Sequence, residues 1–253
     1  MTTLSTENKP NNTPILQQYQ AVGDSFVSTE ERNFSLGDLC DELIFVGGCA
    51  AGMLCTSVQA PPPRATFDVD LVAEVTALAG YHALEARFAA RGFTRDMSPD
   101  APICRWRVGN VEVDLMPTDE RVLGFSNRWY PIATATATPM ILPSGASIRL
   151  IAAPAFLATK FEAFATRGGN DLMASHDFED IINVLDGRPG VETEIAAAGG
   201  ELAAYLTARF RAVLLHPDFE NTLPGLVVYD ELYDSRIETV HRRVTAIANM
   251  KPT

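Results

Sequence analysis

The stretch that decides the fold reads TFDVDLV, residues 66–72. Its polar and apolar side chains alternate with a period of two, which is typical of a strand that buries one face. Residues i and i+2 of a strand share a face, so Asp68 and Asp70 project side by side. Neighbouring carboxylates repel each other unless a cation lies between them, and Mg²⁺ prefers such oxygen ligands. An isolated acidic pair more often lies on a solvated strand face than in a metal site, so the flanking sequence is needed to distinguish the two.

A glycine pair upstream favours a binding site. Residues 43–46 form a short apolar run of strand type that stops at Gly47 and Gly48. Glycines allow backbone N–H groups to approach a phosphate closely, and a helix N-terminus beside them favours anions. Residues 50–58 are small and apolar enough to form that short helix. Taken alone, the glycine pair also suits a tight turn that binds nothing.

A third carboxylate belongs to a hairpin further along the chain. Residues 103–108 and 111–116 are strand-like runs joined by the two-residue turn Gly109-Asn110. Asp114 lies on the polar face of the second run, opposite the face formed by its valines and leucine. A carboxylate on a neighbouring strand is what a second metal, or a base for an attacking hydroxyl, would require.

Basic side chains lie near these carboxylates in the sequence. Arg64 and Thr66 place a guanidinium and a hydroxyl close to any phosphate that the site binds. Arg105 and Arg107 flank Trp106 in the first hairpin strand. We expect these two arginines to form a solvated edge more often than a phosphate contact, and Trp106 to pack in the core.

The rest of the sequence divides into two halves of different character. A weak helical pattern lies within residues 14–40, an amphipathic helix is predicted at 76–91, and residues 130–150 look like further β structure. The alternating Ala-Thr run at 133–138 is expected to be an edge strand. Further helices are predicted at 154–167, 173–186, 200–215 and 229–248. The predicted organisation is a flexible tail at 1–13, an α/β core at 14–150 and a mostly helical region at 151–253.

Composition excludes several classes of protein. The 253 residues carry 20 Lys and Arg against 32 Asp and Glu, a net charge of −12, and 47% of them are hydrophobic. This apolar share suits a folded domain, no apolar run is long enough to cross a membrane, and the polar N-terminus does not look like a secretory signal. The acid excess disfavours a protein that coats long nucleic acid. Four cysteines without a CxxC pair argue against a zinc site and suit reduced thiols in a cytoplasmic protein.

Together the motifs resemble the nucleotidyltransferases of the DNA polymerase β superfamily. The matching residues are FVGG at 45–48, Arg64 and Thr66, Asp68 and Asp70, and Asp114 within VDL at 113–115. The chain is most similar to the AbiEii-type branch of bacterial toxin–antitoxin and phage-defence systems. Lys160 resembles a helical lysine of that branch, and SHDFEDI at 175–181 resembles its acidic helix motif. The resemblance spans residues 43–186 and departs from the superfamily where Gly48 replaces a common serine.

The resemblance implies an α+β fold. It would be a polymerase-β-type nucleotidyltransferase core, with a mixed sheet flanked by helices, followed by a mostly helical C-terminal region. It also implies a two-metal transfer of a nucleoside monophosphate from an NTP to a hydroxyl, with release of pyrophosphate. Asp68 and Asp70 would hold Mg²⁺ against the triphosphate, and Asp114 would position a second Mg²⁺ and activate the acceptor. The expected nucleotide-binding residues are Gly47, Gly48, Arg64, Thr66 and Lys160.

Four residues of the helical half have roles that the sequence leaves open. Lys160 and Arg167 fall near one face of a helix, and the resemblance implies that Lys160, and with less support Arg167, contacts the triphosphate. Asp177 and Asp180 share a face of the next helix. They orient Lys160 or a base on the acceptor, or they form an acidic first turn that suits the helix dipole, with Ser175 as N-cap.

Two functions follow from these expectations. The first is an Mg²⁺-dependent nucleotidyltransferase whose acceptor is a tRNA 3′ end, a protein hydroxyl or a small molecule. The alternative is a non-catalytic nucleotide-binding or toxin–antitoxin partner protein of the same fold, paired with a cognate antitoxin. All three acidic positions are present, which favours the enzyme. The acid excess leaves room only for a small, local nucleic-acid contact, and no membrane partner is expected.

Overall fold

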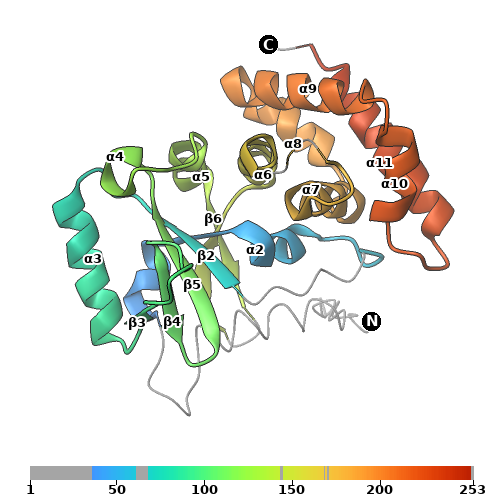
Figure 1. Ribbon diagram of the computed structural model, residues 1–253. Helices are drawn as coiled ribbons and strands as arrows, with labels where there is room; N and C mark the ends of the chain where they lie inside the picture. Colours follow the sequence, from blue (N-terminus) through green and yellow to red (C-terminus); the bar gives the residue numbers. More distant parts are fainter. Residues whose placement is uncertain (1–35, 61–67, 143–144, 168, 170, 252–253) are drawn as a thin grey trace, which may run out of the picture.

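One mixed sheet forms the core of the structure, which is a computed structural model that describes residues 36–60, 68–142, 145–167, 169 and 171–251. Within these residues seven strands run in the order β3-β4-β5-β2-β1-β7-β6 (Figure 1). Parallel pairing joins β2 to β5 and β1 to β7, and the other neighbours are antiparallel. The strands are β1 (Ile44–Val46), β2 (Asp68–Ala73), β3 (Thr94–Arg95), β4 (Arg105–Val108), β5 (Val111–Pro117), β6 (Thr138–Ile141) and β7 (Ser147–Leu150).

The central strands confirm the predicted alternation. In β2 the side chains of Val69 and Leu71 are buried, whereas Asp68 and Asp70 are partly exposed on the other face. The hairpin of β4 and β5 also lies where the two-residue turn at Gly109-Asn110 predicted it. The sheet therefore buries one face of its central strands and leaves a polar face beside a cleft.

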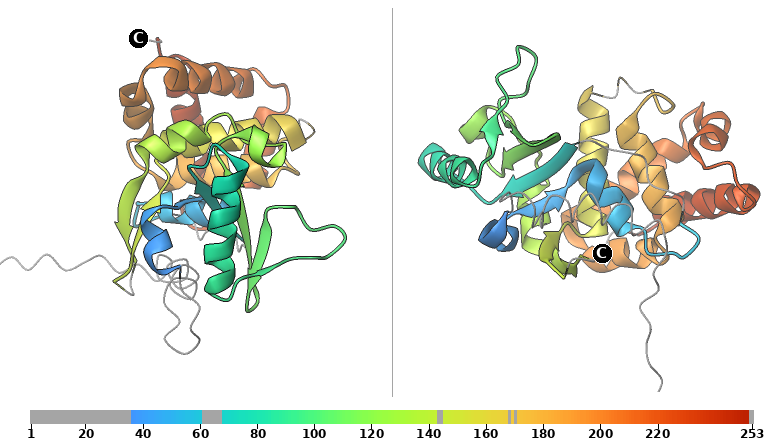
Figure 2. Two further views of the ribbon diagram at one scale, coloured as in Figure 1. Left: turned by 90° about the vertical axis from the view of Figure 1, so that its left-hand side faces the viewer. Right: turned by 90° about the horizontal axis from the view of Figure 1, so that it is seen from below.

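Helices surround the sheet and then form the C-terminal region. Helix α3 (Leu78–Ala90) lies beside the sheet, where the Tyr81 hydroxyl donates a hydrogen bond of 2.8 Å to the Leu115 carbonyl of β5. Figure 2 shows the later helices gathered at the other side of the molecule. They are α6 (Ala153–Arg167), α7 (His176–Gly187), α8 (Val191–Ala198), α9 (Gly200–Leu214), α10 (Phe219–Leu226) and α11 (Tyr233–Ala248).

The two regions are joined through α2 (Gly47–Leu54), which packs against β2 and against α7. The architecture is therefore α+β, with a seven-stranded mixed sheet flanked by helices and a helical C-terminal region, within the residues described. The predicted helices at 154–167, 173–186, 200–215 and 229–248 correspond to α6, α7, α9 and α11. None of the helices seen in this part of the chain is both long and apolar enough to cross a membrane.

Most of the Ala-Thr run is helical, so the edge strand predicted at 133–138 is wrong except at Thr138, where β6 begins. Helix α5 (Tyr130–Thr136) has Pro131 in its first turn, where a missing N–H costs nothing, and alanine is a strong helix former. Ala133 is fully buried, and the Thr134 hydroxyl donates to the Pro131 carbonyl at 2.9 Å. The edge strand follows as β6. The alternation of Ala and Thr in this run therefore does not reflect a strand with one buried face.

Smaller differences concern element boundaries. Helix α2 covers Gly47–Leu54 instead of 50–58, because the chain turns into the helix at the glycine pair itself and ends before the polar residues at 56 and 57. Helix α3 begins at Leu78 instead of residue 76, and Leu78 itself is 50% exposed. The short elements β3, α4 (Glu120–Leu123), α8 and α10 were not predicted. The predicted tail at 1–13 and most of the 14–40 helical pattern lie outside the described residues, which begin with the 3₁₀ helix η1 (Gly37–Asp41).

Candidate functional site

Gly47 and Asp70 are in direct contact at the junction of β1, β2 and α2. Val46 is paired with Asp70 across the two strands, and the chain then enters α2 through Gly47 with φ of +67°. A Cβ atom at Gly47 would lie 1.7 Å from Asp70 Oδ2. Only glycine accommodates both the left-handed backbone and the carboxylate. The glycine pair and the acidic pair of the predicted motif are therefore in contact, through Gly47 and Asp70.

A grid of charges covers the polar face of three adjacent strands. In the parallel pair β2–β5, Asp68 lies opposite Glu112 and Asp70 lies opposite Asp114. In the antiparallel pair β4–β5, Arg105 lies opposite Asp114 and Arg107 lies opposite Glu112. Paired residues of neighbouring strands share a face. The register alone thus brings together four carboxylates and two guanidinium groups, which are Asp68, Asp70, Glu112, Asp114, Arg105 and Arg107.

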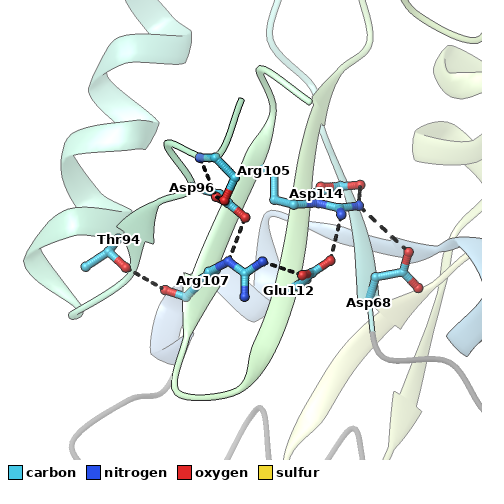
Figure 3. Close-up of polar contacts among 8 residues, drawn as sticks. Asp68, Thr94, Asp96, Arg105, Arg107, Glu112 and Asp114 are labelled. Atoms are coloured by element: carbon cyan, nitrogen blue, oxygen red, sulfur yellow. Dashed lines mark hydrogen bonds and ion pairs between the residues drawn. The ribbon is translucent and has the colours of Figure 1, made fainter. Parts of the chain in front are cut away.

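Arg105 holds the third predicted carboxylate (Figure 3). Its Nε and one terminal nitrogen donate to the two carboxylate oxygens of Asp114, both at 2.8 Å, and its other terminal nitrogen donates to Glu112 at 2.6 Å. Asp68 Oδ2 lies 4.0 Å from the same guanidinium. These hydrogen bonds, above all those to Asp114, raise the pKa of Arg105. The expected solvated edge is therefore a set of ion pairs, and Arg107 continues it by pairing with Asp96 and Glu112 at 2.6 Å each.

The surroundings of Asp70 disfavour the charged form of its carboxyl. Burial raises the pKa of its carboxyl to about 6, and the charge of neighbouring Asp68 adds to the rise. Lys160 and Arg167 act in the opposite direction. A carboxylate in such surroundings gains most from a cation placed against it.

Lys160 lies in a buried cluster between α6 and α7. Its Nζ is 3.1 Å from Asp177 Oδ1 and 2.6 Å from Asp180 Oδ2, and all three residues are less than 9% exposed. Burial opposes the charge of Lys160, but Asp180 and Asp177 outweigh it, so the pKa of Lys160 is raised. Of the readings left open for the acidic pair, orientation of Lys160 fits this geometry. The N-cap is also present, because Ser175 accepts from the Phe178 N–H at 3.3 Å.

Arg167 connects this cluster to solvent. Its guanidinium donates to both oxygens of Asp177 at 2.8 and 3.0 Å, yet 70% of its side chain is exposed. Burial disfavours the charge of Asp177, but the hydrogen bond from Arg167 and the charge of Lys160 prevail and lower its pKa. Asp177 is thus fully charged near neutral pH, and its two cationic partners are fixed relative to each other.

A cleft of about 840 Å³ separates the sheet from α5, α6 and α7. Five predicted residues line it, which are Gly47, Asp70, Lys160, Arg167 and Asp177. The lining does not include Gly48, Asp68, Asp114 or Asp180, although each neighbours a residue that does. Arg64 and Thr66 lie outside the described residues. The cleft therefore brings the glycine turn, two carboxylates and two cations of the sequence prediction to a common space.

The far wall of the cleft was not predicted. It comes from the segment that enters α5, including Ser126, Asn127 and Arg128. The Asn127 side-chain amide donates to the Thr159 carbonyl of α6 at 3.0 Å, which ties this segment to the helix that carries Lys160. The available signal for this wall was arginine next to tryptophan in NRWYP, residues 127–131.

Arg128 is held by aromatic rings on this wall. Its guanidinium carbon lies 4.8 Å from the Trp129 ring centroid and 4.6 Å from that of Tyr205. It is also 3.3 Å from Glu162, and half of its side chain, 52%, stays exposed. Cation–π contacts of this kind fix an arginine without removing its donors from solvent. The wall thus presents an ordered cation to the cleft.

The donor set fits one hard cation better than two. Asp68 and Asp70 are adjacent carboxylates of the kind that Mg²⁺ prefers, whereas both oxygens of Asp114 already accept from Arg105. Across the described residues, no group of three or more His, Cys, Asp or Glu side chains is arranged to hold a metal ion. The four cysteines are buried and free, as their sequence context predicted.

Comparisons with known proteins assign no family to the chain. No protein-family model matches the sequence, and no curated protein matches it. Among solved structures, the crystal structure of JHP933 from Helicobacter pylori is similar, with a TM-score of 0.41 and 10% identity over 96% of this chain and 93% of that chain.

Proposed function

We propose that this protein is an Mg²⁺-dependent nucleotidyltransferase that moves a nucleoside monophosphate from an NTP to a hydroxyl acceptor. The observation that carries the proposal is the cleft of about 840 Å³ that brings Gly47, Asp70 and Lys160 together. Its volume lies within the ordinary range for small-molecule sites. A glycine turn at a helix start, a carboxylate whose surroundings disfavour its own charge, and buried or anchored cations are the groups that a metal-bound triphosphate requires.

The proposed roles follow from the positions of the side chains. Asp68 and Asp70 hold Mg²⁺, which supplies charge neutralisation and fixes the phosphates. Lys160 and Arg167 lie across the cleft from Asp70 and neutralise the remaining phosphate charge. Asp177 holds both cations in place through its two oxygens. The backbone at Gly47 allows the phosphates to approach the start of α2.

The reaction itself is an in-line displacement. The acceptor oxygen forms a bond to the α-phosphorus while the bond from that phosphorus to the oxygen bridging the β-phosphate breaks, and pyrophosphate leaves. The acceptor hydroxyl gives up its proton to a base or to solvent. The protein contributes mainly positioning and neutralisation of charge, because phosphoryl transfer needs little covalent help.

The test uses two labels. Full-length protein is incubated with Mg²⁺, each NTP and a bacterial extract that contains tRNA and protein, with the label on either the α- or the γ-phosphate. We expect the α-label to appear on an acceptor and the γ-label in pyrophosphate. A γ-label on the acceptor would indicate phosphoryl transfer instead. The position of the α-label on tRNA, protein or a small molecule identifies the acceptor class.

Variants make the test specific to the cleft. Asp68→Ala and Asp70→Asn are expected to abolish label transfer and to weaken binding of Mg²⁺ with NTP. Asp38→Asn is the matched control, since Asp38 forms only exposed pairs with Arg87 and Arg91 on another part of the surface. The proposal fails if no NTP is consumed with any acceptor and Asp68→Ala binds NTP and Mg²⁺ as well as wild type.

A non-catalytic partner protein of the same fold is the second candidate. The observation that favours it is the pairing of Asp114 with Arg105, which leaves neither oxygen of that carboxylate without a donor. A binding protein would retain NTP affinity in the cleft but release no pyrophosphate. Calorimetry of NTP binding together with a pyrophosphate assay separates the two candidates.

A further inference from the structure

Arg105 lies against Asp114, the carboxylate that the sequence resemblance associates with a second metal ion. Its position follows from backbone register, because β4 pairs with β5 so that Arg105 is directly opposite Asp114. A side chain placed there emerges beside the Asp114 carboxylate on the same face of the sheet. The contact therefore does not depend on a long, flexible side chain reaching across the molecule.

The contact between the Arg105 guanidinium and the Asp114 carboxylate is bidentate. Nε and a terminal nitrogen of Arg105 each donate at 2.8 Å to a different oxygen of Asp114, and the remaining terminal nitrogen donates to Glu112 at 2.6 Å. Bidentate arginine–carboxylate pairs are among the strongest hydrogen-bonded ion pairs. Only 20% of the Arg105 side chain and 11% of that of Asp114 are exposed. Such a pair is screened little by solvent.

A neighbouring pair holds Arg105 from the side. Arg107 donates to the other oxygen of Glu112 and to Asp96, both at 2.6 Å (Figure 3). Glu112 therefore accepts from both arginines at once, one at each oxygen. Moving Arg105 away from Asp114 would break bonds to two carboxylates. The guanidinium is thus a fixed charge of the acidic face.

We propose that the Arg105 guanidinium takes the place of a second metal ion at Asp114, so that the acidic face binds one divalent cation, through Asp68 and Asp70, and not two. The inference rests on the proposed metal-dependent transfer. It changes the role of Asp114, which becomes a positioning residue that holds Arg105 beside Asp68, with Arg105 4.0 Å from that carboxylate. It also removes Asp114 as the base for the acceptor, since both of its oxygens accept hydrogen bonds from Arg105.

The test counts metal ions. Mn²⁺ alone is titrated into the full chain and followed by calorimetry and by electron paramagnetic resonance. Wild type is expected to saturate at one ion per chain, with the spectrum of an isolated ion. Arg105→Gln frees Asp114 and is expected to bind two ions, with the spin-coupled spectrum of ions that are about 4 Å apart. Mn²⁺ should also raise the melting temperature of Arg105→Gln more than that of wild type.

The control is Arg107→Gln, because Arg107 lies on the same strand and pairs with Glu112 but does not contact Asp114. It is expected to bind one ion, as wild type does. Two ions in wild type would overturn the inference and leave the proposed transferase intact, and this count does not depend on whether a variant folds. A folded Arg105→Gln that binds a single ion would also overturn it. No ion in wild type would contradict both proposals.

Discussion

Gly47 and Asp70 are in such close contact that position 47 has no room for a side chain. The carboxylate of Asp70 fills the space in which any other residue at position 47 would place its Cβ. The backbone at Gly47 is also left-handed, with φ of +67°. Both features come from the meeting of β1, β2 and the start of α2. Adding a single methyl group at position 47 therefore tests this contact.

Gly47→Ala is expected to destabilise the protein and to remove NTP binding, because the new methyl group displaces Asp70. The control is Gly109→Ala in the hairpin turn, which also has positive φ, +59°, but meets no atom within 4 Å. That control isolates the backbone penalty of roughly 1–2 kcal/mol. Urea denaturation should show a clearly larger loss for Gly47→Ala. Equal losses would mean that Asp70 does not occupy this space.

Asp70→Asn is expected to stabilise the metal-free protein while it abolishes activity. The folded pKa of Asp70 is about 6, against 3.8 for the free carboxyl. Between these values the folded state binds more protons than the unfolded state, so the free energy of unfolding of wild type falls as pH rises from about 4 to 6. A shift of about two units sets an upper limit of roughly 3 kcal/mol. Melting curves of both proteins in chelator from pH 4 to 8 should diverge above pH 4, and a less stable Asp70→Asn at pH 7.5 would contradict the argument.

Helices α6 and α7 are joined by charge as well as by apolar packing. Lys160 supplies one positive charge to two carboxylates that are almost fully buried, and Arg167 supplies a second from the exposed end of α6. The two cations differ in burial, and this difference separates their contributions to folding and to binding. Lys160 is part of the folded core, whereas Arg167 is available to a ligand at little structural cost.

Lys160→Met is expected to cost roughly 3–5 kcal/mol of stability, because it removes the buried cation that lies 3.1 Å from Asp177 and 2.6 Å from Asp180. Arg167→Gln is expected to cost about 1 kcal/mol or less, since its side chain is 70% exposed. It should nevertheless weaken ATP binding, as measured by calorimetry. Arg209→Gln, which removes an arginine that packs over Phe161 and does not line the cleft, is the matched control. Unchanged ATP affinity in Arg167→Gln would remove Arg167 from the binding site.

The whole molecule depends on the docking of the helical region onto α2. Gly187, at the end of α7, accepts from the N–H groups of Thr56 and Ser57 at 2.9 Å each. A Cβ atom at Gly187 would lie 2.6 Å from the sulfur of Cys55. The cleft lies between the same two regions, since β2 supplies Asp70 and α6 supplies Lys160. A substitution that disturbs the packing of the helical region on α2 should therefore also weaken ligand binding in the cleft.

Gly187→Ala is expected to lower stability by about 1–3 kcal/mol through overpacking against Cys55 and to reduce ATP affinity at the same time. Calorimetry should still show a single unfolding transition, because one continuous cluster of buried side chains spans the sheet and the helices. Gly80→Ala is the control, because Gly80 is also a helical glycine and a Cβ atom there would lie no closer than 3.3 Å to its nearest neighbour, the Val75 side chain. Two separate transitions in wild type would show that the regions fold independently.

The helices and strands that the sequence predicted were inferred from local patterns of residues. The alternation at Asp68–Asp70 predicted β2, the two-residue turn predicted the β4–β5 hairpin, and apolar spacing predicted α6 and α7. These patterns failed where two local signals disagreed, as in the Ala-Thr run, whose alternation favoured a strand but whose alanines and first-turn proline favour the helix α5. Burial of Ala133 against the core decided that conflict, and burial is a property of the folded chain.

The sequence by itself determined the α+β class, the acidic pair on β2 and the presence of Gly47, Lys160 and Asp114, because periodicity and residue type are local properties. Only the tertiary structure decided which of these residues face a common cleft. Strand register placed Arg105 against Asp114, and helix packing placed Lys160 between Asp177 and Asp180. Both depend on neighbours many residues away in the chain. The spacing of the carboxylates is therefore a property of the sequence, whereas the charged groups that lie against each carboxylate depend on which side chains the fold brings beside it.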